Sequence, residues 1–281
     1  MERALSTHLF ANHRLTTVWL ERIWNAGIPL VEIFCARQHL DYRDKAQIAE
    51  VGHWFHDSQL KFHAVHGPMF SDDAWGRTGP NAVIDITETA KARRIQSVDE
   101  IKRALEMAEV APFQYLIQHL GVTGQEFDEH RLDAAFTSLE EIMLFARHRG
   151  VEVLLENTPN ELASAEKLQM FLAMTHLNLN VCFDVGHAHM RGNIEQEFRK
   201  LKPRIRSTHV HDNDGEKDLH LFPGAEGGSV VWRAAMQLLR SAPGQYPLLL
   251  ELREAPEMAH PLDEVNLVFE QLESVKTDDA S

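Results

Sequence analysis

The chain has little cysteine, no long apolar run and no excess of basic charge. Its only cysteines in 281 residues are Cys35 and Cys182. Both fall in segments that resemble buried strands, so we expect free thiols in a reducing compartment rather than a disulfide framework. No segment reaches the about 18 apolar residues of a membrane span, and the first residues lack a secretory signal. These absences predict a cytoplasmic protein with no membrane partner.

Acidic residues outnumber basic ones, which bears on the partner. The chain has 42 Asp and Glu against 28 Lys and Arg, for a formal net charge of −14. Proteins that bind nucleic acid gain affinity from each Lys or Arg that contacts a phosphate. We therefore expect no nucleic-acid partner and a small substrate instead, which a metal ion rather than bulk charge would hold if it is anionic.

Strand-like and helix-like segments alternate along the whole chain. Each short, β-prone apolar run is followed by a segment with helical periodicity. The eight expected strand and helix pairs are 4–10 with 14–26, 30–35 with 43–58, 61–66 with 97–110, 113–120 with 131–149, 151–156 with 164–175, 180–186 with 193–201, 204–210 with 229–241, and 246–252 with 262–275.

This alternation predicts one closed barrel of the α/β class. Ser97 and Glu100 have the spacing of a helix-start capping box, and Gly27 and Gly150 follow expected helix ends. Because no linker rich in Pro, Gly or Ser interrupts the pattern, we expect a (β/α)8 TIM barrel over residues 1–276 and a tail over 277–281. An open doubly wound sheet is the alternative, but no glycine-rich phosphate motif follows the first strand.

Histidines and carboxylates stand where the expected strands end. Charged groups have no role at the last residue of a buried strand, so their repetition indicates one shared polar site. In barrels of this kind, active sites lie at the carboxyl ends of the strands. Neutral imidazoles and carboxylates are ligands of zinc, manganese and iron. The residues in question are His66, His119, Glu156, Asp184, His187, His209 and Glu251.

Two long loops are expected to shape access to that site. Residues 67–96 carry Phe70, Trp75 and Arg77, and Trp75 could either stack on a sugar ring or anchor the loop. Residues 212–228 carry Asp218 and His220, which would face the same way in a locally extended segment.

A resemblance to a known superfamily extends over nearly the whole chain. The motifs HGPMF, HLG, LLENTPN, FDVGH, HVHDNDG, DLH and LLLELRE occur in this order at the expected strand ends and loops. In order and position they resemble the xylose isomerase-like TIM barrels, which include sugar and sugar-phosphate isomerases and epimerases, inosose dehydratases and the endonuclease IV group.

The resemblance implies a divalent metal, with one to three ions of manganese, zinc or magnesium. It assigns the central ion to four residues, namely Glu156, Asp184, His209 and Glu251. It implies a second site at His66 and His119 with Glu156 bridging, and a third at His187, Asp218 and His220. Instead of binding a metal ion, His66, His119 and His187 could contact the substrate. Trp75 is a further candidate for substrate contact.

The same resemblance implies an isomerase or epimerase that abstracts a proton next to the metal-bound carbonyl of a sugar, sugar phosphate or cyclitol. Glu156 and Glu251 would then act as base and acid, with His187 bonded to a substrate oxygen. Isomerisation, epimerisation and inosose-type dehydration share this first step and stay open. An abasic-site nuclease also stays open, although endonuclease IV usually has HPG and DTCH where this chain has HLG and DVGH.

Overall fold

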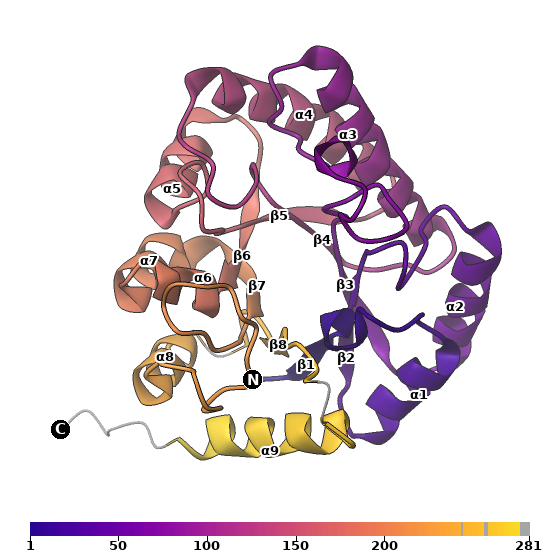
Figure 1. Cartoon of the computed structure of the whole chain (residues 1–281), viewed down its shortest axis with the longest axis vertical. Helices are drawn as coiled ribbons and strands as arrows, with labels where there is room; N and C mark the ends of the chain where they lie inside the picture. The colour runs from indigo at the N-terminus through magenta and orange to yellow at the C-terminus, as the bar shows by residue number, and fades with distance from the viewer. Residues whose placement is uncertain (243, 256–257, 276–281) are drawn as a thin grey trace.

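The computed structural model describes residues 1–242, 244–255 and 258–275. Eight strands form one sheet in the order β7-β6-β5-β4-β3-β2-β1-β8, and the helices surround them (Figure 1). All laddered neighbours are parallel. The strands are β1 (Arg3–Ser6), β2 (Leu30–Phe34), β3 (Lys61–His66), β4 (Tyr115–Gln118), β5 (Glu152–Glu156), β6 (Asn180–Asp184), β7 (Ile205–His209) and β8 (Leu248–Leu250).

The ring of strands closes between β7 and β8 through a few bonds just past the end of β7. Val210 forms an isolated parallel bridge with Leu250. Its amide donates to the carbonyl of Leu249 at 2.9 Å, and its carbonyl accepts from the amide of Glu251 at 3.2 Å. Because β8 also pairs with β1, the strands make a nearly closed barrel. The expected (β/α)8 architecture is confirmed, since a doubly wound sheet would reverse its strand order partway.

The helices pack on the outside of the barrel, so the strands are covered on both faces. This explains why β2, β4, β6 and β8 are buried at every residue. The helices are α1 (Thr17–Asn25), α2 (Lys45–Asp57), α3 (Lys91–Leu105), α4 (Glu129–Arg147), α5 (Ala165–Met174), α6 (Val185–Met190), α7 (Ile194–Leu201), α8 (Trp232–Leu239) and α9 (Pro261–Ser274).

Local signals position several of these helices as expected. The Asp44 side chain accepts hydrogen bonds from two amides at the start of α2, and Ser164 does the same for one amide of α5. Gly27 and Gly150 have left-handed φ angles of 79° and 72° after α1 and α4, which an L side chain rarely adopts. Both cysteines are buried and free, as predicted.

The expected capping box at Ser97 and Glu100 was wrong, because α3 begins six residues earlier, at Lys91. Ser97 Oγ instead accepts from the amide of Asp85 at 3.0 Å. The Glu100 carboxylate accepts from the hydroxyl of Tyr42 at 2.7 Å. Both polar side chains therefore form hydrogen bonds with other segments of the chain. The local sequence pattern cannot distinguish such tertiary contacts from a helix cap.

Two other boundaries differ from the prediction. The first strand ends at Ser6, and Thr7–Phe10 forms a 3-10 helix instead of continuing the strand. The short helix α6 was not expected. It starts directly after β6 because the Asp184 side chain accepts from the amide of His187 and caps it. The expected tail at 277–281 lies outside the described residues. No helix in the described part of the chain is long and apolar enough to cross a membrane.

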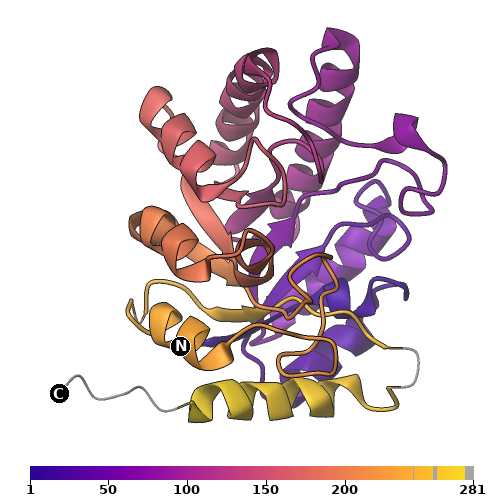
Figure 2. The ribbon, with the colours of Figure 1, turned by 60° about the vertical axis from the view of Figure 1, so that its left-hand side comes forward.

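The segment 212–228 extends beyond the strands between β7 and α8 (Figure 2, orange). It is organised around the Asp212 carboxylate, which is 1% exposed. Its oxygens accept hydrogen bonds from the amides of Ser229, Val230 and Gly224 at 3.0–3.1 Å. The indole N–H of Trp232 donates to the same carboxylate at 2.6 Å. One buried anion therefore ties both ends of the loop to α8.

We expect Asp212→Asn to destabilise the protein by about 2–4 kcal/mol, because an amide keeps only one acceptor oxygen and its NH2 group would face other donors. Urea unfolding followed by circular dichroism measures the loss. The control is Asp214→Asn in the same loop, whose carboxylate is exposed and accepts from two local amides. The control should shift the midpoint much less, and equal shifts would contradict the role of Asp212.

Candidate metal centre

Four side chains from consecutive strands meet at the carboxyl end of the barrel. Glu156 ends β5, Asp184 ends β6, His209 ends β7, and Glu251 directly follows β8. Each offers one ligand atom, and these atoms all lie within 4.8 Å of one another. None of the four residues is more than 2% exposed. The parallel register of a closed barrel produces this convergence, since all strands end at the same mouth.

His209 lies at the centre of this group. Its Nδ1 is 3.0 Å from Glu156 Oε1, 3.2 Å from Glu251 Oε2 and 3.8 Å from Asp184 Oδ2. Its Nε2 faces the opposite way and donates to Glu32 Oε2 at 3.0 Å. A carboxylate behind the imidazole fixes the tautomer, so Nδ1 is the nitrogen left for a metal ion. Glu32 thus lies under the site and accepts a hydrogen bond from this histidine.

A second group shares Glu156 with the first. His119 Nε2 lies 2.9 Å from Glu156 Oε2, and His66 Nε2 lies 3.6 Å from the same oxygen. The His66 ring is held by its Nδ1, which donates to the carbonyl of Gly67 at 3.0 Å. His66, His119 and Glu156 therefore present three ligand atoms to one point.

The third expected group assembles only in part. Among the described residues, Asp218 and His220 present ligand atoms together with His211, whereas His187 does so with Asp184 and His211. Asp218 Oδ2 is 3.2 Å from His187 Nε2 and 3.3 Å from His220 Nε2. His220 has a left-handed φ of 50°, so the loop turns there instead of alternating. The expectation of an extended segment was wrong, and the turn is what brings the two side chains together.

His211 is a member of this site that the sequence analysis missed. It is fully buried, and its Nε2 lies 3.2 Å from Asp184 Oδ2 and 3.7 Å from Asp218 Oδ1. Its ring stacks on that of His220 with centroids 4.1 Å apart. A Cβ at Gly186 would lie 2.0 Å from its ring, so only glycine leaves room there. The HVH spacing could have revealed it, because alternate residues of an extended chain face the same side.

Asn157 supports the neighbouring ligands through its side chain and backbone. Its amide group bonds both backbone polar atoms of Asp184, at 2.9 and 2.8 Å. Its carbonyl accepts from His187 Nδ1 at 2.9 Å. These bonds orient the side chains at the end of β6, and they explain the Asn that follows Glu156 in the sequence.

The groups around Asp218 shift one another's ionisation strongly. Burial alone would lower the pKa of His187, but the charges of Asp184 and Asp218 outweigh it and raise that pKa well above its usual value. Burial would raise the pKa of Asp218, yet His220 and His187 hold it far below the usual range. Ionisable groups whose pKa values are shifted by specific charged partners in a cleft mark a candidate functional site.

The donor set fits a divalent cation. Glu32, Glu156, Asp184 and Glu251 are buried, and in the described part of the chain each pairs only with histidines, never with Lys or Arg. Buried carboxylates are costly unless they are paired or coordinate a metal. Three carboxylates and an imidazole form an oxygen-rich set that suits manganese, magnesium or zinc.

A cavity of about 210 Å³ opens onto this centre. It lies at the barrel mouth, and Trp75 closes one side, where it packs edge-on against Phe34 at 5.4 Å. The loop that carries Trp75 ends at residue 90 rather than 96, because α3 begins at Lys91. Two further lining residues, His8 and Arg253, had no role in the sequence analysis. The side chains that line it include His8, Phe34, His66, Phe70, Trp75, His119, Glu156, His187, Asp218, His220, Glu251 and Arg253.

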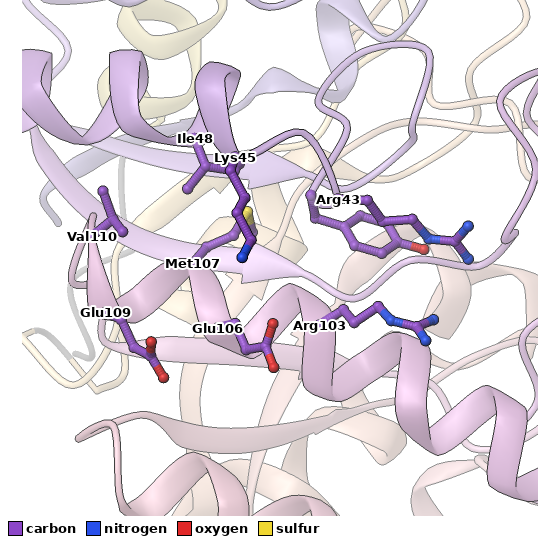
Figure 3. A pocket seen from close by; sticks show the side chains of 9 residues that line it. Arg43, Lys45, Ile48, Arg103, Glu106, Met107, Glu109 and Val110 are labelled. Carbon is purple, nitrogen blue, oxygen red and sulfur yellow. The ribbon is translucent and has the colours of Figure 1, made fainter.

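A larger cavity, of about 670 Å³, lies on the outside of the barrel, between α2 and the C-terminal end of α3 (Figure 3). Its residues include Arg43 and Arg103, and both bind the carboxylate of Glu100. None of the strand-end residues lines it. The chemistry therefore points to the smaller cavity at the mouth.

Two curated relatives come from Methanocaldococcus jannaschii, and each is described as an uncharacterized protein. The chain is 29% identical to the Methanocaldococcus jannaschii protein MJ1311 over 245 residues, covering 80% of this chain and 75% of that protein. It is 27% identical to MJ1614 of the same organism over 146 residues, or 50% of this chain and 58% of that protein. The chain thus spans less than two thirds of MJ1614.

Solved structures share the fold at low identity. A D-tagatose 3-epimerase-like protein superposes with a TM-score of 0.76 at 23% identity, covering 98% of both chains. The IolI protein, solved with a bound zinc atom, superposes with a TM-score of 0.76 at 17% identity, covering 99% of this chain and all of the other. The model of the family described as "Xylose isomerase-like TIM barrel" matches residues 20–273, and the chain therefore belongs to that family.

Proposed function

We propose that the protein is a divalent-metal-dependent isomerase or epimerase of a small sugar or cyclitol. The observation that carries the proposal is the convergence of Glu156, Asp184, His209 and Glu251 within 4.8 Å at the mouth of the barrel. The neighbours support the same chemistry, since one is described as epimerase-like and another holds zinc.

The four converging residues would hold the central ion. When bound, a divalent ion supplies a Lewis acid that polarises a carbonyl and acidifies the neighbouring C–H. The groups of His66 with His119, and of His187 with Asp218 and His220, would hold one or two further ions or bind substrate hydroxyls.

Proton transfer is assigned to Glu156 and Glu251. Both carboxylates reach the same nitrogen of His209, at 3.0 and 3.2 Å, and both line the cavity. One would remove the proton next to the carbonyl and the other would return it. His187 lines the same cavity and would donate to a substrate oxygen, since its Nδ1 is already bonded to the carbonyl of Asn157.

The cavity supports a small substrate. Its volume of about 210 Å³ is below the roughly 300 Å³ at which pockets for drug-sized ligands begin. Trp75 and Phe34 present aromatic surface on which the carbon face of a sugar ring can pack. The proposal includes a single domain over residues 1–276 and a cytoplasmic location, which the free thiols of Cys35 and Cys182 support.

Two other reactions remain as candidates. Dehydration of an inosose begins with the same proton abstraction, so the same residues support it. An abasic-site nuclease is favoured by the further groups of ligand atoms around the central one. It is opposed by the net charge of −14, which repels a phosphate backbone.

Our first test of the metal site is Asp184→Ala. The purified protein should contain at least one equivalent of divalent metal, and the variant should lose most of it because one of four ligands is removed. Elemental analysis measures the content, with circular dichroism to show that the barrel remains folded. Asp214→Ala, an exposed acid on the same loop as Asp218, is the control. Unchanged metal content in Asp184→Ala would refute the assignment.

The additional ligand groups predict a stoichiometry above one. After loading with zinc or manganese and removal of free ions, we expect more than one equivalent per chain. His119→Ala and His220→Ala should each lower that value, since each removes a ligand from a different group. If the wild-type protein never exceeds one equivalent and both variants match it, these histidines serve the substrate or the structure instead.

The reaction class is tested by exchange of substrate protons with deuterated water. We expect metal-dependent deuterium incorporation next to a carbonyl in a panel of ketoses and inososes. Glu251→Gln should slow it by roughly 10²–10⁴-fold through loss of the acid or base. Abasic duplex DNA at ~0.15 M salt should neither bind appreciably nor be cut. Efficient nicking that is lost in Glu251→Gln would make the nuclease the correct function.

A further inference from the structure

Besides the carboxylates and histidines of the metal centre, the cavity has lining residues with a different chemistry. They come from segments far apart in the sequence: His8 follows β1, Phe34 ends β2, Trp75 belongs to the loop over residues 67–90, and Arg253 follows β8. His8 joins them, because its ring packs edge-on against Phe34 at 4.7 Å and Trp75 at 6.0 Å.

Among the residues that the structure describes, Arg253 is the only Lys or Arg that lines the cavity. Its backbone is fixed, since its amide donates to the carbonyl of His220 at 2.9 Å, while its side chain is exposed. Among the described residues no carboxylate pairs with it, and the adjacent Glu254 binds His13 at 3.1 Å instead. Arg131, by contrast, is paired with the carboxylate of Asp85 at 2.7 Å. The guanidinium of Arg253 is therefore available to a ligand.

Trp75 supplies an unused donor on the same cavity. Its indole Nε1 is buried and has no hydrogen-bond partner in the described part of the chain. Its backbone has a left-handed φ of 45°, which is strained for a bulky residue. An unpaired buried N–H and a strained backbone both cost free energy. A ligand oxygen in the cavity would remove the first of these costs.

His8 adds an acceptor. Its Nδ1 donates to the carbonyl of Leu252 at 3.0 Å, so a neutral ring presents the lone pair of Nε2. The ring centroid lies 4.5 Å from that of His220, beside the third group of ligand atoms. A substrate hydroxyl can therefore donate a hydrogen bond to His8, while the guanidinium of Arg253 and the indole N–H of Trp75 bind an anionic oxygen of the same substrate.

We propose that the substrate carries an anionic substituent, a carboxylate or a phosphate, which Arg253 binds with the indole N–H of Trp75. The proposal rests on the proposed function, because it places the reacting carbonyl at Glu156 and Glu251. Those carboxylates repel an anion, whereas Arg253 attracts one and can bind two of its oxygens together. The opposed charges orient the substrate, with its anionic end toward Arg253.

Matched substrates test the proposal in the deuterium-exchange assay. Keto sugars are compared in neutral, phosphorylated and carboxylated forms, and the preferred anion identifies the substituent. Arg253→Gln should raise KM for the anionic form by roughly 10–100-fold, the loss of a charge-assisted pair, and Arg253→Lys should recover part of it. Trp75→Phe, which keeps a ring but removes the N–H, should raise the same KM by a smaller factor. Equal effects of Arg253→Gln on neutral and anionic forms would overturn the proposal.

The control removes an equivalent charge at the other end of the barrel. Arg147 is exposed at the end of α4 and lines a cavity beside the starts of β5 and β6. Arg147→Gln should leave KM for every substrate unchanged, which separates a local contact from the effect of net charge.

Direct binding separates failure of this proposal from failure of the proposed function. Calorimetric titrations use inorganic phosphate alone and malonate alone with wild-type protein, Arg253→Gln and Arg147→Gln. If either anion binds the wild-type protein, and its affinity falls at least tenfold in Arg253→Gln but not in Arg147→Gln, the anion site is supported. This result holds even if no sugar exchanges deuterium and the isomerase proposal is wrong. Absence of binding by both anions, or binding that Arg253→Gln does not weaken, overturns the anion site even if neutral sugars exchange deuterium.

Discussion

The mouth of this barrel is governed by the need to stabilise carboxylates that the fold buries together. Parallel strands in a closed ring end at one place, and here four of them contribute or lead directly into Glu32, Glu156, Asp184 and Glu251. Buried anions at this spacing repel one another strongly. His209 bonds or contacts all four, and a divalent ion would supply the remaining positive charge.

The surrounding structure holds that arrangement in place. Asn157 bonds both backbone polar atoms of Asp184, and His211 contacts its carboxylate. The room for His211 exists only because residue 186 is glycine. These contacts come from three different strand ends, so each ligand is oriented by a neighbour that is distant in sequence.

The loops add side chains to the cavity that the strand ends do not supply. Asp212 anchors the segment that carries Asp218 and His220, and the loop over residues 67–90 brings Trp75 to the same cavity. Among the described residues, Trp75 and His220 are the non-glycine residues with positive φ. Strain confined to two cavity residues is consistent with selection for ligand binding over local stability.

The sequence alone determined the alternation of strands and helices, and the position of ligand-type residues such as Glu156 and His209 at strand ends. Both follow from local periodicity, which is written in consecutive residues. Only the tertiary structure decided that Ser97 binds the amide of Asp85 rather than caps a helix, and that His8 and Arg253 share one cavity. These two arrangements depend on residues that lie up to 245 positions apart in the sequence. Closure of the barrel brings such residues together.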